Sequence, residues 1–92
     1  MGPRKATPFA TEVLRGEVPT QYRPLEFEYD GTTYPSEHLS RFENTAMAYQ
    51  WPDAVMCRIF PLTLVKAAQV WFGQLLPGSI HTFQGFSDMF LQ

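Results

Sequence analysis

The strongest hydrophobic pattern in the chain lies between Cys57 and Ile80. Over residues 62–76, apolar residues recur at the spacing of one helix face, and a second apolar set widens that face until it takes up most of the circumference. A helix with so wide an apolar surface has to be covered on more than one side. We therefore expect a central helix over 62–76, with Trp71 and Phe72 as its largest packing groups. The two sets are Leu64, Ala67, Ala68, Trp71 and Leu75, and Val65, Ala68, Phe72 and Leu76.

Two shorter helical patterns precede this segment. The first predicts a helix over 35–49 that ends before Pro52, because proline disfavours helix at the residue before it. Asp53 is expected to cap the second helix, over 54–60, and Pro61 to break it. The inward-facing residues would be Leu39, Phe42, Ala46 and Tyr49 on the first helix, and Val55, Met56, Ile59 and Phe60 on the second.

A further helix is predicted near the C-terminal end of the sequence. Pro77, Gly78 and Ser79 form a turn signal, and Thr82 can cap a helix that begins at Phe83. Its apolar face would carry Phe83, Phe86 and Phe90 at positions i, i+3 and i+7. From residue 67 to residue 92 the only formal charge is Asp88. We expect this aromatic, uncharged end either to pack against the rest of the domain or to be covered by further chain.

The N-terminal part reads as a proline-rich arm. A short helix over 8–14 is possible, with Thr7 as its cap and Gly16 at its end, and residues 17–35 are expected to be extended with a turn at Asp30-Gly31. Four aromatic residues would attach the arm to the bundle surface. They could instead stack nucleic-acid bases, but the neighbouring carboxylates of Glu26, Glu28 and Asp30 would repel phosphates. The aromatic residues are Tyr22, Phe27, Tyr29 and Tyr34.

These patterns predict an all-α fold, a small bundle of about four helices with an extended N-terminal arm. The arm would span residues 1–34 and the helical unit residues 35–92. With 92 residues the chain can form one small domain, and its 45% hydrophobic content is too high for a disordered tail. A net charge of −2 argues against binding nucleic acid through phosphate neutralisation. No apolar run reaches the ~18–20 residues that a membrane span needs, so we expect a cytoplasmic protein.

Few residues offer candidate chemistry. Cys57 lies in an apolar helical pattern, where a buried structural thiol is the common case and a nucleophile would need a lowered pKa. His38 is expected to pack or cap, and His81 to lie solvated in a turn. The histidines and the single cysteine match no zinc spacing, and the glycines match no phosphate-binding loop. We expect no enzyme activity, no metal, no cofactor and no small-molecule substrate.

In their order along the chain, the motifs resemble the N-terminal part of the capsid-like region of Gag from plant gypsy-type (metavirus) LTR retrotransposons. The resemblance covers nearly the whole chain from Pro8 onward, and its specificity lies in the ordered set. Its motif and core residues are Tyr29, Asp30, Gly31, Leu39, Phe42, Cys57, Phe60, Pro61, Leu64, Ala68, Trp71, Phe72, Leu75, Pro77 and Phe83. Further matching pieces are Pro8-Phe9, Thr11-Glu12-Val13-Leu14, Thr32-Thr33, His38, Met47-Ala48-Tyr49, Asp53-Ala54, Arg58 and Gly78-Ser79-Ile80.

This resemblance implies a helical capsid domain that self-associates into virus-like particles around the RNA of the element. The family packages RNA through a basic or zinc-knuckle segment downstream, so RNA contact is expected only through segments outside this sequence. The capsid region of the family continues through further helices after Leu91, and we expect this chain to correspond to its first part. Two other interpretations remain open: a Gag-derived module whose groove accepts a peptide, such as its own proline-rich arm, and a non-functional remnant of the element.

Overall fold

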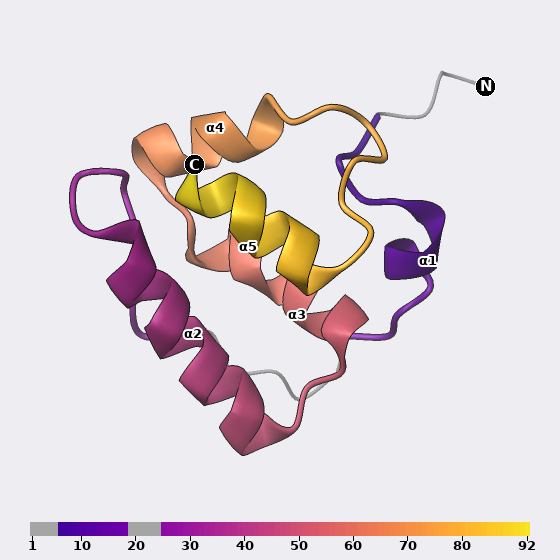
Figure 1. The fold of residues 1–92 in the computed structure, drawn as a ribbon, viewed down its shortest axis with the longest axis horizontal. Helices are drawn as coiled ribbons and strands as arrows, with labels where there is room; N and C mark the ends of the chain where they lie inside the picture. The colour runs from indigo at the N-terminus through magenta and orange to yellow at the C-terminus, as the bar shows by residue number, and fades with distance from the viewer. Residues whose placement is uncertain (1–5, 19–24) are drawn as a thin grey trace.

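The computed structural model describes residues 6–18 and 25–92 (Figure 1). The described part is all-α, as predicted, and it contains no sheet, since its only strand-like pairings are the isolated bridges Phe9–Ile80 and Tyr29–Leu64. Tyr22, one of the aromatic residues expected to attach the arm, lies outside the described residues. The helices are α1 (Thr11–Leu14), α2 (Pro35–Tyr49), α3 (Asp53–Ile59), the 3-10 helix η1 (Phe60–Thr63), α4 (Lys66–Gly73) and α5 (Phe83–Leu91).

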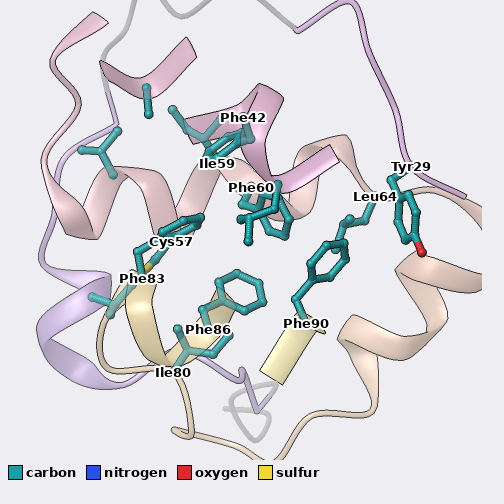
Figure 2. Close-up of a cluster of buried hydrophobic side chains, with 14 of the residues drawn as sticks. Tyr29, Phe42, Cys57, Ile59, Phe60, Leu64, Ile80, Phe83, Phe86 and Phe90 are labelled. Carbon is teal, nitrogen blue, oxygen red and sulfur yellow. The ribbon is translucent and has the colours of Figure 1, made fainter. Parts of the chain in front are cut away.

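The core is built around Phe60, at the junction of α3 and η1. Its side chain is fully buried, and the rings of four other phenylalanines surround it in mostly edge-to-face arrangements (Figure 2). These neighbours come from α2 and α5, so Phe60 joins three elements of the fold. The centroid distances from Phe60 are 4.9 Å to Phe42, 5.0 Å to Phe90, 5.4 Å to Phe86 and 5.7 Å to Phe83.

The prediction of a central helix over 62–76 is wrong. After η1 the chain is extended at Leu64, because this residue pairs with Tyr29 of the N-terminal arm. The Tyr29 N–H donates to the Thr63 carbonyl at 2.8 Å, and the Val65 N–H donates to the Tyr29 carbonyl at 2.9 Å. These long-range hydrogen bonds replace helical ones, and α4 therefore begins only at Lys66.

The shortened helix α4 lies at the edge of the fold. Ala68 is its only buried residue, whereas Trp71 and Phe72 are half-buried and Ala67 is exposed. Leu75 is half-buried, and Leu76, which was expected to face inward, is 75% exposed. In Figure 1, α5 occupies the middle of the view with α4 beside it, and α5 packs against α2 and α3. Thus α5, with Phe83, Phe86 and Phe90 all buried, takes the central place that was expected for the longer helix.

Helix α2 has the bounds that its pattern predicts, and Leu39, Phe42 and Ala46 are buried as expected. Tyr49, the last residue that the pattern placed on the buried face, is instead 60% exposed. The helix ends in a left-handed residue, Gln50, whose φ is 56°. The Gln50 N–H donates to the Met47 carbonyl and the next N–H to the Ala46 carbonyl, which is the Schellman pattern of a helix C-terminus.

Asp53 does not cap its own helix. Pro52 occupies the N-cap position of α3, and Asp53 is the first helical residue. Its carboxylate instead accepts a hydrogen bond of 2.9 Å from the Phe83 N–H, at the start of α5. The α-helix ends at Ile59, close to where Pro61 was expected to break it, and Pro61 itself lies buried in the 3-10 helix η1 that follows. Of the residues expected to face inward in this region, Val55, Ile59 and Phe60 are buried and Met56 is half-buried.

The N-terminal segment belongs to the same core. Residues 8–10 are not helical, in contrast to the prediction, because their backbone forms hydrogen bonds with Ile80. The Ile80 N–H donates to the Pro8 carbonyl, and the Ala10 N–H donates to the Ile80 carbonyl, each at 2.8 Å. Thr7 therefore caps no helix, and α1 begins at Thr11. Val13 is 1% exposed and packs with the buried residues of the other helices.

The turn predicted at Asp30-Gly31 is confirmed. The carboxylate of Asp30 accepts hydrogen bonds from the Thr32 hydroxyl and N–H, at 2.7 and 2.9 Å, and these hold the pKa of Asp30 below its usual value. Gly31 has a φ of +98°, which L-residues rarely adopt. Of the aromatic residues near this turn, Tyr29 is buried and Phe27 half-buried, but Tyr34 is 72% exposed.

Candidate interaction surfaces

Cys57 lies in the core with no exposed surface. Burial, with a smaller contribution from the charge of Asp53, raises the pKa of the thiol to about 12. A nucleophilic cysteine needs the opposite shift, because the thiolate is the reactive form. The environment of Cys57 is therefore that of a structural thiol.

His38 is also buried, as a packing residue. Its Nε2 atom lies 2.8 Å from the Thr63 hydroxyl, which donates its own proton to the Phe60 carbonyl at 2.7 Å. The hydroxyl oxygen is thus the acceptor, and Nε2 carries the proton. The imidazole ring stacks on Tyr29 at a centroid distance of 5.3 Å. Burial, and to a lesser extent the positive charge of Arg41, lowers the pKa of His38.

His81 is exposed, as predicted. Its Nδ1 atom lies 2.7 Å from Glu12 Oε1, and this hydrogen bond is the main reason that the pKa of Glu12 is lowered. The two histidines thus have different partners, and the hydrogen bonds of the described residues join neither of them to Cys57. No group of three or more His, Cys, Asp or Glu side chains within residues 6–18 and 25–92 could hold a metal ion.

Several large apolar residues are exposed on the surface, and they provide better candidates for binding than the polar side chains do. Most of them lie near two places, the C-terminal end of α2 and the segment from η1 to the end of α4. Exposed apolar residues of this kind often form the contacts between proteins. The most exposed are Leu76 (75%), Met47 (74%), Tyr34 (72%), Leu62 (62%), Tyr49 (60%) and Val70 (59%).

The first candidate surface is an open hollow of about 410 Å³ at the end of α2, which we call the α2-end hollow. Three of its residues have large apolar side chains, and the single charged residue in its wall is Glu43. Beside it, the Tyr49 ring stacks on the Trp51 ring with a centroid distance of 5.2 Å and an angle of 11°. The residues lining the hollow are Glu43, Ala46, Met47, Gln50, Trp51 and Met56.

The second candidate surface is the outer face of α4. Ala67, Val70 and Gln74 are exposed and follow each other at the i, i+3, i+7 spacing of one face. A side chain at Gly73 would meet no atom within 4 Å, so that position also faces open space. Apart from Lys66 at the start of α4, this stretch carries no charge.

The third candidate surface is a groove of about 280 Å³ beside Trp71, between the Tyr29–Pro35 turn, α4 and the end of α5. Four of the motif residues meet there: Tyr29, Gly31, Ala68 and Trp71. The other motif residues do not form a common site. Leu39, Phe42, Cys57, Phe60, Pro61, Leu64 and Phe83 are buried, Asp30, Phe72 and Leu75 are half-buried, and Pro77 is exposed.

The sequence pattern alone does not predict the α2-end hollow. The helical periodicity places Tyr49 on the buried face, and Trp51 stands out in the sequence only as the residue before Pro52. The available signal was the density of large apolar residues at Met47, Tyr49, Trp51 and Met56, around a proline that ends a helix. Such a cluster favours a surface patch only once the core is known to be filled by other residues.

Within the described residues, none of the helices combines the length and the apolar character needed to cross a membrane. Compared with family models, with curated proteins and with solved structures, the chain matches none.

Proposed function

We propose that this chain is a structural protein of the Gag capsid type, which acts through contacts with other copies of itself. The observation that carries the proposal is the outer face of α4, where Val70 is 59% exposed in a region almost without charge. Identical copies bring identical charges together, so a self-contact is favoured where a surface is apolar and uncharged.

Two further features support this proposal. All seven Lys and Arg residues lie at or before Lys66, and Asp88 is the only formal charge after it. The apolar face of α4 therefore lies in a segment, residues 67–92, that carries a single formal charge. The ordered motifs resemble gypsy-type Gag, and the all-α fold is the class that this resemblance implies. Contact with RNA would be made by segments outside this sequence, and the protein would act in the cytoplasm.

The test is static light scattering on the purified chain over a wide concentration range, with a circular-dichroism melt beside it. We expect reversible growth in mass with concentration. Val70→Glu should weaken this association by roughly tenfold or more, because it places like charges opposite one another. Leu14→Glu is the matched control, since Leu14 is also exposed but lies on α1. A parent chain that stays monomeric at every concentration would contradict the proposal.

The groove beside Trp71 favours a second candidate function, that of a peptide-binding module. Its walls include the rings of Tyr29, Trp71 and Phe90, which suit an extended peptide with apolar side chains. The proline-rich arm does not supply that peptide through residues 8–10, because these bond to Ile80 instead. A monomer that binds a foreign peptide would support this function, and a monomer that binds nothing would support the interpretation as a remnant of the element.

A further inference from the structure

We infer that the junction between η1 and α4 is a conformational switch, in which residues 61–66 become helical and join η1 and α4 into one helix when the Tyr29 segment leaves Leu64. The Tyr29 segment is residues 27–30. This inference goes beyond the proposed function, because it concerns a change of state within a single chain. It rests on the local sequence, on the strained start of α4 and on two sets of hydrogen bonds that compete for the same backbone groups.

The backbone between the two helices conflicts with its own sequence. Residues 62–76 have the apolar spacing of one long helix, yet Leu64 and Val65 are extended, with ψ values of 128° and 164°. Lys66 then adopts a φ of 52°, in the left-handed region that is unfavourable for residues with a Cβ. No side chain caps the first turn of α4, and the charge of Lys66 opposes the positive end of the helix dipole. The interruption is therefore not stabilised by its own residues.

The Tyr29 segment supplies part of the stabilisation. Its two backbone hydrogen bonds, to the Thr63 carbonyl and from the Val65 N–H, lie on either side of Leu64, which is beside Tyr29 in Figure 2. The Tyr29 hydroxyl donates to the Thr33 carbonyl at 3.3 Å, which fixes the ring. Without this segment, the extended form would leave the Thr63 carbonyl and the Val65 N–H without these partners. A buried backbone group without a partner is costly, so loss of the segment favours the helical form.

Gln69 supplies the rest of the stabilisation, from within α4. With its amide nitrogen directed toward η1, its side chain donates to the Pro61 and Leu64 carbonyls at 3.3 and 3.0 Å. In a continuous helix the same two carbonyls would accept from the N–H groups of Val65 and Ala68, four residues further along. A change from one arrangement to the other therefore leaves neither carbonyl unpaired.

The buried face is compatible with both arrangements. Leu64 is 3% and Ala68 5% exposed, and Trp71 is half-buried. In one continuous helix these residues follow each other at i, i+4 and i+7, on a single face. Joining the two helices therefore keeps the same side chains directed toward the core.

His38 lies where the contacts of the junction meet, and its protonation is the trigger. Its Nε2 atom bonds to the Thr63 hydroxyl, and its ring stacks on the Tyr29 ring. A second proton on the ring would place a charge inside this buried contact. Release of the Tyr29 segment admits water to the ring, so a fall in pH favours the released state.

The charged groups around His38 do not offset this effect. Arg41, on the same helix, adds repulsion, whereas the carboxylates of Glu28 and Glu37 line the hollow of about 210 Å³ that His38 borders. The η1 helix brings no charged residue, and α5 carries only Asp88. Burial lowers the pKa of His38 although these carboxylates are near, so burial is the dominant effect.

The experiment is NMR relaxation dispersion on the full chain, recorded on the 13Cα and 15N nuclei of residues 61–66 at pH 7.5 and 5.5. The method detects minor states that exchange in microseconds to milliseconds, and it gives their chemical shifts. We expect a minor state with helical 13Cα shifts that is more populated at pH 5.5 by roughly threefold or more. His38→Phe should remove this response. A parent population that does not change with pH would overturn the role of His38.

Two substitutions at exposed positions should move the population in opposite directions. Gln69→Leu removes both side-chain hydrogen bonds and introduces a good helix former, so it should raise the minor population by roughly fivefold or more. Lys66→Gly should lower it, because glycine suits the left-handed φ and disfavours the interior of a helix. Gln74→Leu is the matched control, since Gln74 is exposed and follows the last residue of α4. It should leave the population as in the parent.

Four results would overturn the inference. The first is a minor state with random-coil shifts, which would mean that the junction unfolds. The second is the absence of exchange at residues 61–66 both in the parent at pH 5.5 and in Gln69→Leu. The third is an equal rise of the minor population in Gln69→Leu and Gln74→Leu. The fourth is exchange that depends on protein concentration or disappears in Val70→Glu, because such exchange would report self-association and not a change within one chain.

Discussion

At the scale of single residues, the buried His38 makes the stability of the fold depend on pH. Burial lowers its pKa in the folded state below the ordinary value of 6.5, so between the two values the unfolded chain binds the proton more readily. Stability is therefore complete above pH 6.5 and falls as the pH drops below it. We expect urea denaturation to show lower stability at pH 5.5 than at pH 7.5.

His38→Phe should remove this pH dependence, because the Thr63 hydroxyl still donates to Phe60 and no group remains to titrate there. His81→Gln is the control, because His81 is exposed and its replacement leaves the buried imidazole in place. An unchanged slope between pH 5.5 and 7.5 in His38→Phe would show that another group is responsible.

Glycine positions give a second residue-scale prediction, in which two similar substitutions have opposite effects. Gly31→Ala should destabilise the fold by about 1–2 kcal/mol, since its φ of +98° disfavours any residue with a Cβ. The new Cβ would meet Ala67 at an ordinary 3.5 Å, so the backbone and not a clash is the cause. Gly73→Ala, in α4 with open space around it, should stabilise the fold by up to about 1 kcal/mol. Thermal melts of both variants measure the two signs, and a loss of stability in both would contradict this account.

At the scale of elements, the start of α5 depends on a residue of α3. The Phe83 N–H donates to Asp53, and the Gly85 N–H donates to the Thr82 hydroxyl at 3.0 Å, so two of the free N–H groups of this helix are satisfied. Asp53→Ala should cost about 1 kcal/mol, and Asp53→Asn less, because the amide oxygen can still accept the hydrogen bond. Urea denaturation of the two variants makes the comparison. Equal losses would mean that the charge, and not the hydrogen bond, is what matters.

At the scale of the whole molecule, the position of the core determines which side chain contributes most to the stability of the fold. Phe60 is 0% exposed and contacts rings from α2 and α5, so Phe60→Ala should cost about 3–5 kcal/mol. Trp71 is half-buried at the edge, and Trp71→Ala should cost about 1–3 kcal/mol. If Phe60→Ala does not fold, Phe60→Leu still tests the order, with an expected cost of about 1–2 kcal/mol. A larger loss at Trp71 than at Phe60 would restore α4 as the centre of the fold.

Local patterns were sufficient where an element is decided by its own residues. The stripe of Leu39, Phe42 and Ala46 predicted α2, and Thr82 with the phenylalanines after it predicted the start and the buried face of α5. The all-α class, the Asp30-Gly31 turn and the burial of Cys57 were also predictable. In each case the spacing, the cap or the turn chemistry lies within a few residues of sequence.

Only the tertiary structure decided where α4 begins, which helix is central and which apolar residues remain outside. Leu64 has a helical pattern, but it is extended because Tyr29, distant in the sequence, bonds to its neighbours. Asp53 has the sequence of a cap for α3, yet it binds the start of α5. Tyr49 continues a buried stripe, but it lies beyond the end of the core, beside Trp51 and the α2-end hollow. The physical reason is common to all three: periodicity shows that a residue is apolar or polar, whereas its partner is set by segments that only folding brings together.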